Sequence, residues 1–369
     1  MQHKFGALDL IRAGLQDLDR ARTLFDELHN DGIDDDRMRL LLATLEKACD
    51  PDIALSNLVD IIKVMQSQGK DFTNIIADEN SFVRLITVLG VSDEMGKLMR
   101  FRPELVEAAA NDACESHLYN HEQRRAHVLK SVGADPNDHT MPTASLPLAE
   151  AATALRKTYR KQLAAIMAQD ATANDPIEIQ PRISTELSDL ADAALEGALA
   201  IARHEVDGSE HVRFAIIGMG KLGAQELNYV SDVDLIYVVE PADMDTNGMA
   251  LSRIGTKMAT TLQRVCQSVI MGVAEPTLWQ IDGGLRPEGK DGPLVRRLES
   301  HEAYYEQWAE NWEFQALLKA RPVAGDTDLG QAYMDMTRPF VWTASKRDNF
   351  VYDCQQMRKR VEDLIPNPL

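Results

Sequence analysis

The sequence predicts an α+β fold in which a small mixed sheet lies between helical regions. Apolar residues recur at helical spacing through the first two hundred residues and again after residue 298. Between them, short apolar and β-branched runs at 213–218, 234–239 and 277–282 indicate buried strands. The 369 residues suffice for two or three domains. We expect a helical region at 1–144, a core with its leading helices at 145–298, and the start of a helical bundle at 299–369.

The charge of the chain limits its partners. The net charge is -19 and the pI is about 4.9. Such a surface repels a phosphate backbone, so we expect no nucleic-acid partner. A small nucleotide remains compatible, because a metal ion and a few basic side chains neutralise it locally.

Cysteine usage and hydropathy indicate a cytoplasmic protein. The four cysteines are far apart and form no CxxC pair, which is typical of reduced thiols. The first residues carry acidic side chains and no cleavage site, unlike a signal peptide. No stretch approaches the roughly 20 apolar residues that a membrane span needs, so no membrane association is expected.

The helical elements follow in order along the chain. One helix is expected over the apolar positions from Leu8 to Leu24, and another starts at Asp50-Pro51, since proline suits an early helical position. Two polar, Pro-containing stretches, 131–144 and 170–182, are expected to be loops or linkers. Two longer helices are expected beside these stretches, at 145–170 and 183–206. Another helix is expected at 248–270, between the second and third strands.

The segment 214–239 carries the chemistry and allows two interpretations. In the first, Gly218, Gly220 and Gly223 form a dinucleotide-binding GxGxxG after a strand, with Glu240 ending the next one. The spacing disfavours this, because only ten residues separate Gly223 from Asp234. A crossover between parallel strands usually needs a longer helix, within a unit of about 30 residues.

In the second interpretation, Asp232 and Asp234 share one face at the start of a strand. Two such carboxylates repel each other unless a cation lies between them, and carboxylate with phosphate oxygens are the usual ligands of Mg²⁺. The upstream glycines let the backbone approach a phosphate closely. A strand, a glycine turn, a short helix and a DxD strand together indicate metal-assisted phosphoryl-group transfer. The alternative is that Asp232 caps a turn and Asp234 faces solvent.

A third carboxylate is expected from a neighbouring strand. Asp282 is the candidate, since its strand ends at Gly283-Gly284 and Arg286 follows, placed to meet phosphate. Alternatively, Asp282 is a turn residue and Arg286 a solvated charge.

At this point the sequence resembles a known family. GMGKLGAQELNYVSDVDLIYV is similar to the signature of glutamine synthetase adenylyltransferases, and the resemblance spans roughly 180–365. The family carries two nucleotidyltransferase domains of the polymerase-beta-like fold. The C-terminal domain attaches AMP to a tyrosine of glutamine synthetase, and the N-terminal domain removes it. This chain most resembles the N-terminal domain of actinobacterial members.

The resemblance implies roles for individual residues. The matched positions are Gly218, Gly220 and Lys221 in the phosphate loop; Ser231, Asp232 and Asp234 at the metal-binding strand; Asp282 as the third carboxylate; and Arg286 as the arginine after it. Many relatives have an arginine in place of Gly284. Trp312, Glu313, Lys319 and Arg321 match a helix that both domains share, where Glu313 and Arg321 are open to a structural ion-pairing role.

The implied activity is removal of AMP from adenylylated glutamine synthetase by Mg²⁺-dependent phosphorolysis, with ADP as product. The alternatives are adenylyl attachment from ATP and a non-catalytic regulatory or docking module. Glutamine synthetase, phosphate with ADP, or ATP are the expected partners. The family's Gly-Gly-x-Arg segment, its second domain and the part that senses the PII protein are absent from these residues. We therefore expect an N-terminal piece of a bifunctional nitrogen-regulation enzyme.

A weaker motif lies in the first half of the chain. Cys114, His117 and His121 have a spacing that would suit zinc. The segment is very polar and offers no fourth ligand nearby, so a solvated helix face is the favoured interpretation.

Overall fold

The computed structural model describes residues 5–70, 72, 77–110, 119–243 and 247–364. Contacts divide the chain into two units. The first consists of Met1–Tyr119 with Arg160–Ile183, and the second of Asn120–Tyr159 with Ser184–Leu369. The three-part division expected from the sequence stays a prediction.

The first unit is helical around one apolar core. Its helices are α1 (Ala7–Arg12), α2 (Leu18–Asn30), α3 (Asp35–Leu45), α4 (Pro51–Ser67), α6 (Glu79–Val91), α7 (Asp93–Phe101) and α8 (Pro103–Ala110). The start of α4 is confirmed, with the Asp50 side chain accepting a hydrogen bond from the Ile53 amide. The single helix expected from Leu8 to Leu24 is wrong. The chain breaks between α1 and α2, where Gly14 adopts a positive φ of 82°.

The second unit holds the sheet. Its strands are β1 (Val212–Gly218), β2 (Val233–Pro241), β3 (Ile281–Asp282), β4 (Val295–Arg296) and β5 (Arg321–Gly325). Its helices are α9 (His121–Ser131), α12 (Gly220–Gly223), α13 (Gly248–Gln267), α14 (Leu298–Gln307), α15 (Asn311–Leu317), α16 (Thr327–Ala344) and α17 (Phe350–Leu364). Two further helices, α10 (Leu148–Ala171) and α11 (Pro176–Glu205), have residues in both units.

The sheet is mixed, as the sequence predicts. β1 pairs antiparallel with both β2 and β5, whereas β2 pairs parallel with β3 and β4. The antiparallel pairing of β1 with β2 excludes the dinucleotide-binding interpretation, which requires two parallel strands joined by a crossover helix.

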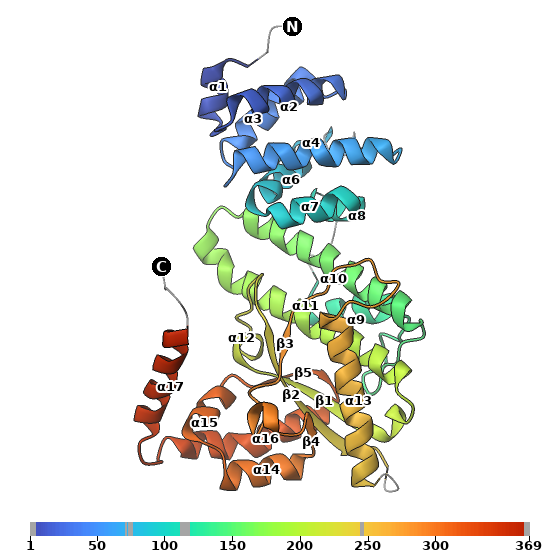
Figure 1. Cartoon of the computed structure of the whole chain (residues 1–369), viewed down its shortest axis with the longest axis vertical. Helices are drawn as coiled ribbons and strands as arrows, with labels where there is room; N and C mark the ends of the chain where they lie inside the picture. Colours follow the sequence, from blue (N-terminus) through green and yellow to red (C-terminus); the bar gives the residue numbers. More distant parts are fainter. Residues whose placement is uncertain (1–4, 71, 73–76, 111–118, 244–246, 365–369) are drawn as a thin grey trace. The chain divides into compact units, whose positions relative to one another are not determined.

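Helices cover both faces of this sheet (Figure 1). On one face, alternate residues of β1 and β2 pack against aromatic and aliphatic side chains of α14, α15 and α16. The other face contacts α13. Since the site lies where β1 ends and β2 begins, these two layers fix its position.

Three expectations need correction. The stretch 170–182 is largely helical, because α11 begins at Pro176 and contains Pro181 within it. The helical pattern expected after residue 298 is interrupted by β5. This strand has five residues, which are too few to show the alternation of a strand in the sequence. Consequently Lys319 and Arg321 lie beyond the C-terminal end of α15, not on the expected helix.

Within the described residues, no helix combines the length and apolar character needed to cross a bilayer. Cys49, Cys266 and Cys354 are free thiols. Cys114 and His117, the first two members of the weak zinc motif, lie outside the described residues.

Candidate functional site

The two strands that carry the aspartates lie side by side. In the parallel pair of β2 and β3, Val233 is opposite Ile281 and Asp234 is opposite Asp282. The Val233 amide also donates to the Gln280 carbonyl over 3.0 Å. Asp232 directly precedes β2 and is exposed. The structure therefore brings all three predicted carboxylates to one end of the β2–β3 pair.

The glycine turn packs directly against Asp234. The Met219 amide donates to the Asp234 carbonyl over 2.9 Å, so the turn begins opposite this residue. Gly220 follows with a φ of 54°, and a Cβ there would lie 2.5 Å from the Asp234 carboxylate oxygen Oδ2. Only glycine satisfies both requirements. The turn then forms the short helix α12, as the sequence predicts.

The carboxylates influence one another electrostatically. Partial burial raises the pKa of Asp234 from its ordinary value of 3.8 to about 6, and the charges of Asp232 and Asp282 add to this rise. The Lys221 ammonium opposes the shift more weakly. Asp234 therefore lies in a negative potential, because the positive charge of Lys221 does not balance the charges of Asp232 and Asp282. A divalent cation with oxygen ligands suits such a potential.

The raised pKa of Asp234 predicts how the stability of the metal-free protein, measured in EDTA, depends on pH. The folded pKa lies above the unfolded value, so ionisation of Asp234 destabilises the fold as the pH rises from about 4 to about 6. We expect Asp234→Asn to stabilise the protein above pH 6 by about 1 kcal/mol, allowing for partial exposure, and to have no effect near pH 4. Urea unfolding across this pH range measures it. Equal stabilisation at both pH values would contradict the assignment.

Two other residues of the predicted loop have visible local roles. Gly218 is buried at the end of β1, and a Cβ there would lie 2.6 Å from Val323 Cγ1. Close packing against β5 thus explains why this position is a glycine. The Ser231 hydroxyl donates to the Asp232 carbonyl over 2.9 Å. This hydrogen bond therefore shapes the backbone that leads into β2. Direct contacts of Gly218 and Ser231 with a ligand stay predictions.

At the end of β3, Asp282 is both a turn residue and a charged neighbour of Asp234, the two roles that the sequence leaves open. The Asp282 oxygen Oδ1 accepts a hydrogen bond from the Gly284 amide at 2.7 Å, which is a turn contact. Its carboxylate charge nevertheless acts on Asp234. The Arg286 guanidinium is not a solvated charge, because it donates to the carbonyls of Gly283, Lys290 and Gly292. Arg286 thus holds the loop that carries Asp282, and its contact with phosphate stays a prediction.

Glu313 has a structural role of its own. Its carboxylate accepts hydrogen bonds from the Glu310 amide at 2.7 Å and from the Tyr304 hydroxyl at 3.0 Å. The contact with the Glu310 amide caps the start of α15, and the contact with Tyr304 joins α15 to α14. The ion pair considered for Arg321 exists, and its partner is Asp192 of α11, with oxygen–nitrogen distances of 2.6 and 3.1 Å.

A second acidic group lies on α9 and α11. Among the described residues, only His121, Asp189 and Asp192 bring three potential ligand atoms within 4.8 Å of one another. The oxygens of Asp232, Asp234 and Asp282 do not all lie within this distance of one another. In the second group both Asp192 oxygens bind Arg321, and Asp189 accepts a hydrogen bond from Gln225. Arg321 and Gln225 therefore compete with a metal for both Asp192 oxygens and for one Asp189 oxygen.

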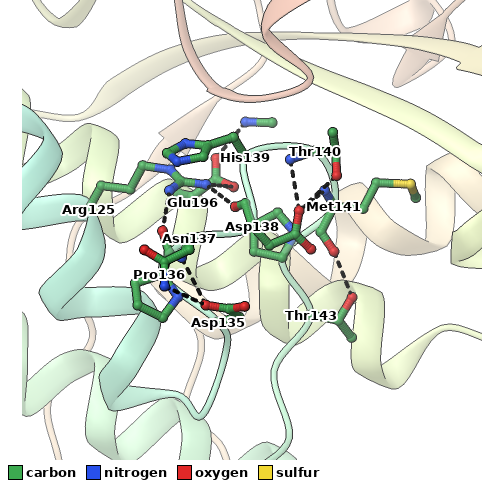
Figure 2. A network of polar contacts seen from close by, with 12 residues as sticks. Arg125, Asp135, Pro136, Asn137, Asp138, His139, Thr140, Met141, Thr143 and Glu196 are labelled. Carbon is green, nitrogen blue, oxygen red and sulfur yellow. Dashed lines mark hydrogen bonds and ion pairs between the residues drawn. The ribbon is translucent and has the colours of Figure 1, made fainter.

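The stretch 131–144 is confirmed as a loop (Figure 2). Its His139 lines the same pocket as His121 and Asp192 of the second group. The Arg125 guanidinium of α9 donates to the carbonyls of Pro136 and Asp138 at 3.1 and 2.7 Å. The Asp138 carboxylate in turn accepts from the amides of Thr140 and Met141. The loop, α9, α11 and β5 line a pocket of about 210 Å³.

Comparison with known proteins adds to this geometry. A sequence model of the family described as glutamate-ammonia ligase adenylyltransferase matches residues 82–336. The chain is 75% identical over 366 residues to the bifunctional glutamine synthetase adenylyltransferase/adenylyl-removing enzyme of Bifidobacterium longum strain DJO10A, covering 99% of this chain and 34% of that protein. It is 40% identical over 359 residues to the enzyme of the same name from Cutibacterium acnes, covering 97% of this chain and 36% of that protein. The chain thus spans about a third of the length of these relatives.

Proposed function

The chain belongs to the glutamate-ammonia ligase adenylyltransferase family, and we propose that it removes AMP from adenylylated glutamine synthetase by phosphorolysis. Inorganic phosphate attacks the phosphorus of the tyrosine-linked AMP. The bond between phosphorus and the tyrosine oxygen breaks, ADP leaves, and the phenolate takes a proton from solvent.

The single observation that carries this proposal is the meeting of Gly220, Asp234 and Asp282. Gly220 packs against the Asp234 carboxylate, and Asp234 lies opposite Asp282 in the register of β2 and β3. Asp232, Asp234 and Asp282 would hold Mg²⁺, which when bound offsets the negative charge of the phosphate groups. The raised pKa of Asp234 supports this fit, because a cation relieves the repulsion that raises it.

The remaining residues bind and orient phosphate. The glycine turn begins beside Asp234, and its glycines let backbone amides approach a phosphate closely. Such amides bind phosphate oxygens. Lys221 is exposed on the same turn and adds a positive charge. Since phosphate itself is the nucleophile, no side-chain nucleophile is needed.

The direction of the reaction rests on the relatives. Their names include both adenylyl attachment and removal, and this chain aligns with about a third of their length. Its resemblance to the N-terminal domain favours removal.

The experiment incubates the chain with adenylylated glutamine synthetase, Mg²⁺ and phosphate. We expect ADP to form, and to need both Mg²⁺ and phosphate. Pyrophosphate release from ATP with unmodified glutamine synthetase would instead assign attachment. Binding of glutamine synthetase with neither product would assign a regulatory module.

A further inference from the structure

Helix α11 holds the segment that links the glycine turn to the aspartates. The Ser188 hydroxyl accepts a hydrogen bond from the Leu227 amide at 3.3 Å. Asp189 accepts one from the Gln225 side chain at 3.0 Å, and Gln225 itself has a positive φ of 56°. A non-glycine residue in this conformation needs surrounding contacts to stay there. The path of the chain after α12 is therefore imposed by α11.

Arg321 connects α11 to the glycine turn itself. Its guanidinium forms a bidentate ion pair with Asp192, whose side chain is fully buried. The same guanidinium donates to the carbonyls of Leu222 and Gly223 at 3.1 and 3.3 Å. These carbonyls lie at the C-terminal end of α12, and the Leu222 carbonyl also accepts a hydrogen bond from the Gln225 amide at 3.1 Å. One side chain thus binds a buried carboxylate and caps the turn.

The surroundings leave the turn little room to move. Arg321 is opposite Gly218 in the pairing of β5 with β1. A Cβ on Gly223 would lie 1.9 Å from the Lys319 carbonyl oxygen. The backbone of α12 therefore packs closely against the segment that leads into β5. The hydrogen bonds of Arg321 to Leu222 and Gly223 hold the two backbones together.

We propose that Arg321, held by Asp192, is a positioning residue that sets the glycine turn against Asp234. Its guanidinium binds Asp192 and the carbonyls of Leu222 and Gly223, and it acts through these carbonyls. The planar guanidinium fork reaches a carboxylate and two carbonyls together, which a lysine ammonium cannot do. The consequence for phosphate binding rests on the proposed function, whereas the effect on the turn does not.

The chain offers a matched control at the opposite end of the same strands. Arg213 of β1 forms a bidentate ion pair with Asp326, with distances of 2.7 and 3.0 Å. This pair also joins β1 to the region of β5, but it lies away from the glycine turn. Arg213→Lys therefore replaces a bidentate pair by a single ammonium contact, as Arg321→Lys does, without touching α12.

The test compares Arg321→Lys, Arg213→Lys and the double variant Asp192→Asn/Arg321→Met. The double variant removes both charges, so it avoids an unpaired buried carboxylate that could prevent folding. Hydrogen–deuterium exchange followed by mass spectrometry reads the amides of 219–227. We expect exchange there to be at least about tenfold faster in Arg321→Lys and in the double variant, and unchanged in Arg213→Lys.

Phosphorolysis provides the second measurement. We expect the KM for phosphate to rise about tenfold in both Arg321 variants, with the KM for adenylylated glutamine synthetase unchanged. The positioning role would be overturned if the amides of 219–227 exchanged at the wild-type rate in both Arg321 variants. It would also be overturned if Arg213→Lys accelerated their exchange as much as Arg321→Lys does. If the wild-type chain catalyses no phosphorolysis, the proposed function fails, and the exchange data alone decide the positioning role.

Discussion

Asp234→Asn is expected to lower Mg²⁺-dependent phosphorolysis at least about a thousandfold. Asp234 is the central carboxylate, since it lies opposite Asp282 and responds to the charge of Asp232. An amide oxygen is neutral and would leave the cation with one negative charge fewer. Loss of about 4 kcal/mol of charge stabilisation corresponds to about a thousandfold in rate. The initial rate of ADP release at saturating phosphate measures it.

Asp291→Asn is the matched control. Asp291 is an exposed aspartate in the short helical turn (Gly289–Asp291) of the same loop that follows Asp282. We expect this variant to retain full activity. Comparable losses in both variants would mean that general surface charge, not the aspartate group, supports turnover.

Gly220→Ala is expected to lower activity strongly by closing the space between the turn and Asp234. The new methyl group would lie 2.5 Å from the Asp234 oxygen Oδ2, and the φ of 54° disfavours any side chain. The backbone strain costs about 1–2 kcal/mol, and the clash displaces either the carboxylate or the turn. We expect activity to fall at least about a hundredfold, with weaker Mn²⁺ binding by titration calorimetry.

Gly289→Ala separates these two effects. Gly289 has a nearly equal φ of 57°, yet the nearest atom to its added Cβ would be 3.6 Å away. We expect a similar loss of stability in urea unfolding, with activity and Mn²⁺ affinity retained. If Gly220→Ala behaved like Gly289→Ala, the turn would not set the position of Asp234.

The sequence predicts the centre of the site because its signals are local. The apolar runs of β1 and β2, the glycines between them and the spacing of Asp232 from Asp234 all lie within one short segment. Side-chain alternation along a strand then fixes which residues share a face. Asp282 could be inferred as well, since a neighbouring strand is expected to supply the third carboxylate.

The rest of the site depends on contacts between distant parts of the chain. Arg321 and Asp192 are separated by 129 positions, and no local pattern pairs them. β5 is too short to show strand periodicity, so its place beside β1 was missed. The hydrogen bonds of Arg286 to the carbonyls of its own loop could not be inferred either, and its contact with phosphate stays a prediction. Such capping contacts depend on the path of the backbone, which side-chain identity alone does not specify.

Anomalous diffraction from crystals grown with Mn²⁺ tests the central claim most directly. The ion replaces Mg²⁺ and binds the same kind of oxygen ligands. We expect a peak bonded to carboxylate oxygens of Asp232, Asp234 and Asp282, beside Gly220. A peak at His121, Asp189 and Asp192, with none beside the glycine turn, would contradict the assignment.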